Sequence, residues 1–385
     1  MNICVYSSLR EIGRTDWDAL AGEGFPFCEY DFLRALETSG SVGEGSGWHP
    51  IYLVAEDRGC IAGAMYLYAK EHSFGEYIFD WAWAEAFERY GLDYFPKLVS
   101  AVPFTPATGP KLLVRPGQEA ARVREALVQA ALQITVQHKL SSFHVLFIPP
   151  EEKPVYAGAE MWIRSSVQYH WHNREYSDFE AFLATLKVKK RHEIRRERKR
   201  VENLPVEIRL LTGDALSAEH ARVMYGFYQD TYDRKRGSPY LTPEFFETIF
   251  DIMRERIVLW LAREEGEWTA GAIHFRKGPN LYGRYWGTRR PYRFLHFELC
   301  YYRAIEYAIE QGLQLVEAGA QGPHKMLRGF SPVTTYSAHW IADPDFRQAI
   351  GQFIAEEKSD IEAGVEQAEI RSAYRREGED SGQRS

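Results

Sequence analysis

The feature that most constrains the fold of this chain is an internal repeat. Residues 53–80 align without a gap with residues 261–288, and seven of the 28 paired positions are identical. Background composition would give about two identities. Each copy contains an Ala-Gly-Ala triplet, at Ala62–Ala64 and at Ala270–Ala272. A repeat of this kind predicts two copies of one folding unit, and 385 residues are enough for two ordinary domains.

Each copy has the pattern of three short strands followed by a helix. Apolar stretches alternate with charged or glycine-containing turns, and the helix after the second copy has apolar residues at helical spacing and Gly312 as its cap. In the second copy the predicted elements are strands at 259–262, 269–275 and 281–286, a helix at 296–311, and strands at 313–316 and 334–341. In the first copy they are three strands within 53–80, a helix near 119–137 and a strand at 143–148. We therefore expect an α/β protein of two tandem units, each a mixed, largely antiparallel sheet flanked by helices.

A change of composition between the copies predicts the domain boundaries. An apolar helical face that includes Phe182 and Leu186 runs into a basic stretch, and we expect Pro205 to end this single helix. The polar tail after about residue 355 is expected to be frayed. The predicted segments are a first unit at 1–175, a basic connecting helix at 176–205, a second unit at 206–355 and a polar C-terminal tail at 356–385.

The basic stretch concentrates positive charge in an otherwise acidic chain. Residues 187–200 contain nine Lys or Arg and two Glu, a local charge of +7, and subtracting this from the net charge of −7 leaves −14 elsewhere. On a helix Lys187, Arg191, Arg195 and Arg198 share one face. This placement favours one anionic partner, such as a tRNA backbone, a lipid pyrophosphate or an anionic membrane surface. The alternative is an ordinary solvated helix face.

Missing motifs exclude several classes of protein. The chain has no G-x-S-x-G, Walker A, Rossmann glycine or H-E-x-x-H pattern, which argues against hydrolases, NTPases, dehydrogenases and zinc proteases. No nucleic-acid motif accompanies the basic stretch, so we expect no sequence-specific DNA binding. No apolar run is long enough to span a membrane. Four scattered cysteines without a C-x-x-C pair predict free thiols in a reducing compartment, the cytoplasm.

Three segments resemble those of a known family. They are KKRHEIRRERKR at 189–200, HFELCYYRAIEYAIEQGL at 296–313 and VEAGAQGPHKMLRGF at 316–330. With them the chain resembles the FemAB-like branch of the GNAT acyltransferase superfamily over about residues 25–345. The resemblance implies two tandem GNAT-like units and acyl transfer. Fem transferases move amino acids from aminoacyl-tRNA onto a peptidoglycan precursor, and related groups use other acyl donors.

The resemblance also implies a donor and an acceptor. The donor would be an acyl-CoA or an aminoacyl-tRNA, the acceptor a small-molecule or peptide amine, and we expect no metal and no tightly bound cofactor. One departure concerns the glycine-rich loop that cradles the pyrophosphate of acetyl-CoA in GNAT proteins. The corresponding stretch here, Arg289–His296, contains no glycine, so we expect acetyl-CoA to bind weakly.

The start of the helix at 296–311 is a candidate anion site. No residue from 289 to 297 is Ser, Thr, Asp or Asn, so the first amides lack an obvious cap, and positive side chains there oppose the helix dipole unless an anion bridges them. The alternative is that water satisfies the amides. The candidate donor- or anion-binding residues are Arg289, Arg290, Arg293, His296, Arg328, Arg191 and Arg195.

The loop after the strand at 313–316 carries the candidate catalytic residues. Lys325 matches the lysine of the Fem loop and could stabilise the oxyanion of a tetrahedral intermediate, whereas His324 could take a proton from the attacking amine. Glu317 could be a base or a structural hydrogen-bond partner, and Arg328 could pair with an anionic substrate. The alternative is a solvated surface loop.

Residues of both halves are candidates for an acceptor cleft. Asp80, Trp81 and Trp83 are placed there by the resemblance, although an Asp cap and packed tryptophans explain them equally well. Tyr282 and Tyr285 could line the cleft or fill the core. Glu298 lies on a polar helix face that could simply be exposed to solvent. The sequence thus predicts an acyl- or aminoacyl-transferase acting on an amine of a peptidoglycan precursor or related peptide. The alternative is a non-catalytic module of the same fold that recognises a cell-wall precursor or peptide.

Overall fold

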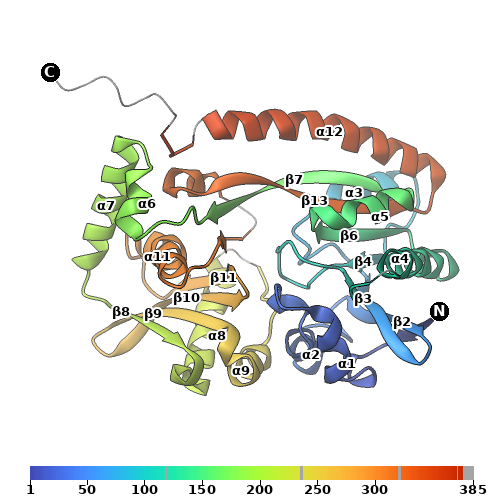
Figure 1. Ribbon diagram of the computed structural model, residues 1–385, viewed down its shortest axis with the longest axis horizontal. Coiled ribbons are helices and arrows are strands. Elements are labelled where there is room, and N and C mark those ends of the chain that lie inside the picture. The colour runs from blue at the N-terminus through green and yellow to red at the C-terminus, as the bar shows by residue number, and fades with distance from the viewer. Residues whose placement is uncertain (118, 235–236, 320–321, 371, 376–385) are drawn as a thin grey trace. The chain divides into compact units, whose positions relative to one another are not determined.

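The computed structural model of the chain describes residues 1–117, 119–234, 237–319, 322–370 and 372–375 (Figure 1). Its internal contacts divide it into two compact units. Unit 1 consists of Met1–Ser166, Tyr240–Met253 and Thr334–Glu362, and unit 2 consists of Val167–Pro239, Arg254–Val333 and Ala363–Ser385. Among the described helices, none combines the length and the apolar character needed to cross a bilayer.

Unit 1 is built on a mixed sheet. Its strands are β1 (Asn2–Tyr6), β2 (Trp48–Asp57), β3 (Cys60–Lys70), β4 (Lys97–Ser100), β5 (Leu112–Val114), β6 (Ser142–Ile148) and most of β13 (Ser331–Ile341). They lie in the order β1-β2-β3-β4-β6-β13, with β5 paired to β3, and only β4 and β6 run parallel. Its helices are α1 (Arg14–Ala21), α2 (Tyr30–Thr38), α3 (Trp81–Arg89), α4 (Ala120–Gln137), α5 (Lys153–Gly158), α9 (Pro243–Ile252) and most of α12 (Pro344–Ile370).

Helix α4 covers this sheet with its apolar face. Val123 and Leu127 lie one turn apart and are buried with Leu53 of β2. Gly63, the middle residue of the first Ala-Gly-Ala triplet, lies beneath the helix, and a Cβ there would be 2.7 Å from Val123 Cγ1. The triplet therefore reflects a close approach of helix and sheet.

Unit 2 repeats this plan. Its strands are most of β7 (Trp162–His172), β8 (Glu207–Thr212), β9 (Ile257–Glu264), β10 (Glu267–Lys277), β11 (Asn280–Thr288) and β12 (Leu315–Glu317). They lie in the order β7-β12-β11-β10-β9-β8, and only β11 and β12 run parallel. Its helices are α6 (Phe179–Ala184), α7 (Val188–Glu202), α8 (Ala218–Arg234), α10 (Leu295–Phe297) and α11 (Arg303–Glu310), with a π-helical turn at Glu298–Tyr302 between the last two.

The predicted strands and helix of the second copy are confirmed. Strands β9, β10 and β11 follow one another as antiparallel neighbours, and the helix runs from Leu295 to Glu310. Gly312 follows it at φ +63°, a backbone conformation that favours glycine, as the capping pattern predicts. In the first copy α4 and β6 confirm the helix near 119–137 and the strand at 143–148.

The third strand predicted for the first copy is wrong. Residues 71–80 form a loop, with Gly75 at φ +81°. The strand in the place of β11 is β4, because each is antiparallel to the preceding strand and parallel to the strand after the long helix. The loop departs from a strand because Glu76 and Asp80 are buried and bind the ammonium of Lys97.

The two sequence repeats exchange their last strands. β6 and β12 hold equivalent places in the two repeats, since each is parallel to the strand that precedes the long helix. The partner of β6 is β13, from the end of the second repeat, and the partner of β12 is β7, from the end of the first. Single cuts at 175 and 355 therefore differ from the observed units, which take β13 into unit 1 and residues 167–172 of β7 into unit 2.

Two local expectations also need correction. The junction holds two helices, because α6 ends at Ala184 and α7 begins at Val188, and α6 has its own cap from Asp178 to the Ala181 amide. The segment after 355 is helical as far as Ile370, and the frayed tail predicted there is wrong for these residues. Residues 376–385 lie outside the described part of the chain.

Candidate functional site

The candidate site of unit 2 lies where β11 and β12 separate. The two strands pair over Asn280–Tyr282 and Leu315–Glu317, after which no pairing between them is found in the described residues. A cavity of about 90 Å³ lies here, and its lining includes Gly283, Arg284, Trp286, Cys300, Tyr301 and Ala318. Residues 320 and 321 of the adjoining loop are outside the described residues. The end of a parallel strand pair, opened in this way, is where α/β proteins place ligands.

The helix beside this cavity has an irregular start. Phe294 precedes its first turn at φ +68°, which is unusual for a bulky residue, and no side chain caps the helix. A π-helical turn follows at once, and such turns are frequent at functional sites. The helix therefore presents Cys300 and Tyr301 to the cavity instead of a regular helical surface.

The arginines predicted to bind an anion at this helix start are exposed. Arg289, Arg290 and Arg293 lie at the surface, and Arg290 pairs with Glu264 at 2.7 Å. His296 is half-buried and contacts the ring of Trp286 with centroids 5.2 Å apart. Only His296 of the four lines the cavity.

Lys325 is a buried ammonium in the loop after β12, near enough to Arg284 and Cys300 of the cavity lining for their charges to act on it. Its residue exposure is 2%, and its Nζ donates a hydrogen bond of 2.9 Å to the Gly319 carbonyl oxygen. Among the described residues, no carboxylate oxygen lies within 4.0 Å of this Nζ. Burial lowers the pKa of Lys325 to about 8, with Cys300 and Glu317 opposing that shift. The alternative of a solvated loop lysine therefore does not hold for Lys325.

The carboxylate of Glu317 is committed to a structural ion pair. Glu317 is 1% exposed, and its Oε1 accepts a hydrogen bond of 2.9 Å from Nη2 of Arg284, whose side chain is equally buried. His170 Nε2 lies 3.8 Å from Glu317 Oε2, and burial lowers the pKa of His170 to about 3, so this imidazole is neutral. The geometry favours the structural reading of Glu317 over the catalytic base.

His324 and Arg328 occupy different environments in the same loop. His324 is exposed, and its Nε2 lies 3.0 Å from the Tyr301 hydroxyl. Its pKa is lowered by partial burial and by the neighbouring Arg328 and Lys325, so the ring is neutral near pH 7 and able to accept a proton. Arg328 is 7% exposed, binds Glu197 at 2.9 Å and stacks 3.4 Å from the ring centre of Phe297.

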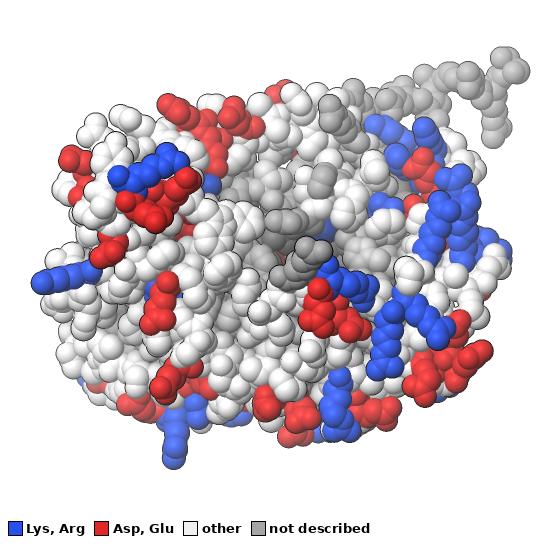
Figure 2. Space-filling view, turned by 180° about the vertical axis from the view of Figure 1, so that it is seen from behind, with Lys and Arg blue, Asp and Glu red and all other residues white. Residues whose placement is uncertain are grey.

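The basic helix α7 is held to unit 2 by ion pairs. Arg198 binds Glu298 at 3.1 Å and Glu306 at 3.0 Å, and Arg195 pairs with Glu180. Glu298 is 3% exposed, so the structure places it in this contact instead of an acceptor cleft. Arg191 is half-buried. Figure 2 shows the Lys and Arg side chains of this side of the molecule interspersed with Asp and Glu.

The two tyrosines of β11 have different surroundings. Tyr285 lines the cavity and contacts the ring of Tyr228 with centroids 5.1 Å apart. Tyr282 is 3% exposed, and its hydroxyl accepts a hydrogen bond from Asn280, so it is a core residue.

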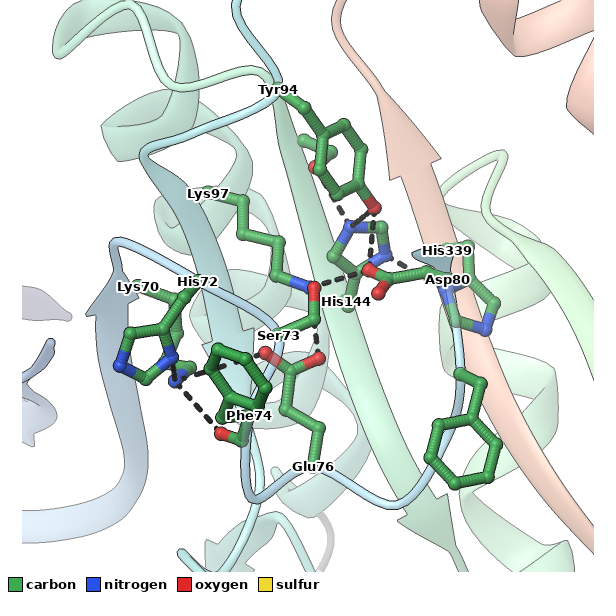
Figure 3. A network of polar contacts seen from close by, with 12 residues as sticks. Lys70, His72, Ser73, Phe74, Glu76, Asp80, Tyr94, Lys97, His144 and His339 are labelled. Atoms are coloured by element: carbon green, nitrogen blue, oxygen red, sulfur yellow. Dashed lines mark hydrogen bonds and ion pairs between the residues drawn. The ribbon is translucent and has the colours of Figure 1, made fainter. Parts of the chain in front are cut away.

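The candidates of unit 1 lie around a buried charge cluster (Figure 3). Asp80 is 4% exposed and pairs with Lys97, which is fully buried and also binds Glu76 and Ser73 at 2.8 Å each. Burial alone would raise the pKa of Asp80, but Lys97 outweighs it and lowers the value to about 2. Asp80 is also the first residue flanking α3, yet its side chain makes no capping bond. Its carboxylate forms an ion pair with Lys97 instead.

The two tryptophans after Asp80 point to different environments. Trp83 is buried, and its ring contacts His339 with centroids 5.0 Å apart. Trp81 is 43% exposed and contacts the exposed ring of Phe74. Of these two, only Trp81 offers a face to a ligand.

A chain of hydrogen bonds leads from Asp80 into the sheet of unit 1. Tyr94 donates its hydroxyl proton to Asp80 at 2.7 Å, and His144 Nε2 lies 3.1 Å from the Tyr94 hydroxyl and 2.7 Å from Ser142 Oγ. His144 Nδ1 and His339 Nδ1 are 2.8 Å apart and share one proton, and His339 Nε2 lies 2.8 Å from Ser337 Oγ. Burial lowers the pKa of His144 to about 3, so both rings are neutral.

Several residues of these networks were not anticipated from the sequence. Arg284, His170 and Lys97 each lie in a strand whose pattern is otherwise apolar or alternating, where a charged residue is usually read as a solvated side chain. The gapless alignment pairs Glu76 with Arg284, but Glu76 lies in loop 71–80 and β4 holds the place of β11, so the repeat gave no signal for these residues. Among the described residues, no group of three or more His, Cys, Asp or Glu side chains is arranged to hold a metal ion.

Known proteins of similar fold and sequence place the chain in a family. FemX, a solved structure, matches 91% of this chain and 100% of its own with a TM-score of 0.54 and 12% identity. The C-terminal domain of a putative lysylphosphatidylglycerol synthetase from Agrobacterium fabrum matches 89% of this chain and 96% of its own, with a TM-score of 0.52 and 10% identity. A tandem GNAT protein from the clavulanic acid biosynthesis pathway matches 89% of this chain and 99% of its own at 13% identity, with a TM-score of 0.48.

These likenesses at low identity concern the fold, which the chain shares with FemX and with the lysylphosphatidylglycerol synthetase domain. No curated protein is similar enough in sequence to match the chain. The FemAB-like family, described as peptidoglycan biosynthesis/recognition, matches residues 8–376. The chain therefore belongs to the FemAB-like family.

Proposed function

We propose that this protein is an acyl- or aminoacyl-transferase that moves an acyl group onto an amine of a peptidoglycan precursor or a related peptide. The observation that carries the proposal is Lys325, a buried ammonium without a carboxylate partner among the described residues. It lies in the loop after β12, near Arg284 and Cys300, which line the cavity beside β11. A buried cation with unused N–H donors is costly unless a ligand or a developing negative charge occupies them. Membership of the FemAB-like family supports the same substrate class.

In the proposed reaction the nitrogen of the acceptor amine attacks the carbonyl carbon of the donor. The carbonyl oxygen becomes negative, and Lys325 stabilises it with an N–H hydrogen bond. The amine proton passes to His324, whose neutral ring accepts it. The donor's sulfur or oxygen leaves with the bonding electrons and takes up this proton from His324, which gives the free thiol or hydroxyl. Most of the rate gain comes from positioning and charge stabilisation, without a covalent intermediate.

The donor is an acyl-CoA or an aminoacyl-tRNA held by its phosphates. The exposed Arg289 and Arg293 and the half-buried Arg191 are the candidate contacts, because Arg195 and Arg328 are already paired with carboxylates. The stretch Arg289–His296 lacks the glycines that let a backbone approach a pyrophosphate, so we expect acetyl-CoA to be a poor donor. Both donor classes are cytoplasmic molecules, and we assign the protein to that compartment.

The test of the proposal is the variant Lys325→Met, which keeps an apolar stem of similar length. We expect it to fold, to bind donor with near-parental affinity and to transfer about 100- to 1,000-fold more slowly, since an oxyanion donor acts mainly in the transition state. The measurement is transfer of a radiolabelled acyl or aminoacyl group to a precursor amine, with thermal unfolding as the folding check.

The matched control is Lys153→Met, whose ammonium lies over the ring of Tyr336. Parental transfer by Lys325→Met would disprove the catalytic role of the loop. If the parent transfers no group from any donor that demonstrably binds, the protein is a recognition module for a cell-wall precursor or peptide.

A further inference from the structure

Three charged groups are buried together at the separation of β11 and β12. Glu317 supplies one negative charge, and Arg284 and Lys325 supply two positive charges, each on a residue or side chain with no more than 2% exposure. One carboxylate cannot neutralise both cations. The choice of ion-pair partner by Glu317 therefore decides whether the Lys325 ammonium keeps its N–H donors for a substrate.

In the structure the carboxylate of Glu317 is paired with Arg284. Its Nη2 lies 2.9 Å from Glu317 Oε1, while its Nη1 donates to the Gly283 carbonyl oxygen at 2.7 Å. Tyr282 pairs with Glu317 in the β11–β12 register. Arg284 is the extra residue of a β-bulge in β11, between Gly283 and Tyr285, and its guanidinium carbon lies 5.4 Å from the centre of the Tyr282 ring. The planar guanidinium of Arg284 holds the carboxylate of Glu317 in a fixed geometry. Lys325 donates its hydrogen bond to the Gly319 carbonyl oxygen instead.

We propose that Arg284 is a positioning residue which holds Glu317 away from Lys325, so that the ammonium keeps its N–H donors for the substrate. This inference rests on the proposed acyl-transfer function. Without Arg284 the buried carboxylate would need another cation, and Lys325 is the neighbour able to supply it. The resulting Lys325–Glu317 pair would occupy the donors that a transition-state oxyanion requires.

The charges around Lys325 agree with this arrangement. Glu317 and Cys300 act to raise its pKa, whereas burial and Arg284 act to lower it, with a resulting value of about 8. His324, in the same loop, and His170, on β7, are neutral and add no charge. The ammonium form therefore predominates at pH 7, and it remains a good hydrogen-bond donor.

The proposal is tested by following the titration of Lys325 itself. The readout is the ¹³Cε chemical shift of Lys325 in ¹³C-lysine-labelled protein between pH 6 and 11, assigned with Lys325→Met. For Arg284→Met we expect the midpoint to rise by at least one pH unit, because Glu317 becomes the partner of the ammonium. For Arg284→Met combined with Glu317→Gln we expect it to fall back to or below the parental value. A midpoint that does not rise in Arg284→Met overturns the proposal.

Two further variants guard against a purely structural effect. Arg284→Lys keeps a cation for Glu317 and should leave the Lys325 midpoint within half a unit of the parent, even if packing changes. Arg276→Met is the matched control, because this arginine of β10 binds Tyr307 and Gln311 instead of Glu317. If Arg284→Met does not fold, a Lys325 midpoint in Arg284→Lys that rises by a unit or more overturns the proposal, and an unchanged one supports it.

Transfer activity gives an independent readout. We expect Arg284→Met to lower the transfer rate at least tenfold with little change in donor affinity, and the added Glu317→Gln to restore at least half of that loss on a logarithmic scale. Failure of the double variant to recover, together with unchanged titration, argues for a structural Arg284 and against the proposal. If the parent protein transfers nothing, the proposed function fails while the titration still decides whether Arg284 controls Lys325.

Discussion

At the scale of single residues, unit 1 contains a cluster of buried charges that balance each other. Lys70 and Lys97 are both fully buried, and they face the carboxylates of Glu76 and Asp80 within a few ångströms. Burial lowers the pKa of Lys70 to about 7 and raises that of Glu76 to about 7, so both charged forms are costly near neutrality. Such a cluster specifies one conformation of loop 71–80 more than it adds stability.

Glu76 gives the cluster a predictable dependence on pH. Its folded pKa lies above the unfolded value of 4.5, so the folded state holds a proton between pH 4.5 and 7 that the unfolded state has released. Stability from this group is therefore present below pH 4.5 and lost as pH rises to 7. We expect the unfolding free energy of the parent, relative to Glu76→Gln, to fall by up to about 3 kcal/mol across that window. Urea titrations at closely spaced pH values measure this, and a difference that is constant or rises with pH contradicts it.

At the scale of elements, the sequence predicted what local patterns determine. The helix at 295–310 and strands β9 to β11 were predicted because their apolar spacing and turn residues lie within the segment itself. Loop 71–80 was misread as a strand because its course depends on Lys97, which follows some twenty residues later and pairs with it only in the folded chain.

The candidate site was predicted to a similar extent. Lys325 and Glu317 were selected as candidates because Lys325 lies in the loop after a strand and Glu317 at the end of that strand, where chemistry is expected. Arg284 was missed, because an arginine within an alternating strand resembles an ordinary solvated residue until the neighbouring strand is known. The pairing of Glu317 with Arg284 and not with Lys325 depends on the folded structure, and no spacing in the sequence predicts it.

Helix α7 allows its structural and ligand-binding arginines to be separated. Arg198 and Arg303 both pair with Glu298, which is 3% exposed, so Arg198→Gln should lower the unfolding free energy by about 1.5–3 kcal/mol by removing charge-assisted hydrogen bonds to a buried carboxylate that Arg303 still neutralises. Arg195 is nearly half-exposed, and Arg195→Gln should cost about 1 kcal/mol or less. Urea unfolding compares the two variants. Equal losses would show that the Arg198–Glu298 pair does not anchor the helix.

At the scale of the whole molecule, the exchange of last strands joins the stability of the two units. β13 supplies residues 334–341 to unit 1 and residues 331–333 to unit 2, and β7 is divided in the same way at Ser166 and Val167. A strand is a continuous, stiff element, so neither unit can lose its last strand without disturbing the other.

This continuity predicts a single unfolding transition. Ala338→Pro removes a backbone donor in β13 beside Val145 of β6 and should lower stability by about 3 kcal/mol or more. Hydrogen exchange in urea, read on peptides from β6 and from β12, should give the same midpoint for both, shifted equally by the variant. Two separate midpoints, with only the β6 peptides shifted, would show that the units unfold independently.

The exchanged strands also have a consequence for the history of the two halves. The connectivity, with each half completing its sheet with the other's final strand, is that of a swapped homodimer whose protomers have been joined into one polypeptide. In a homodimer both copies must carry the same residues, so every change occurs twice. Once joined, each half is free to diverge. Here β11 carries Arg284 beside a cavity, while β4, which holds the place of β11 in the first half, carries Lys97 in a buried charge cluster. Fusion thus permits the two halves to carry different residues, while the first half still supplies strand β7, which completes the sheet of the second.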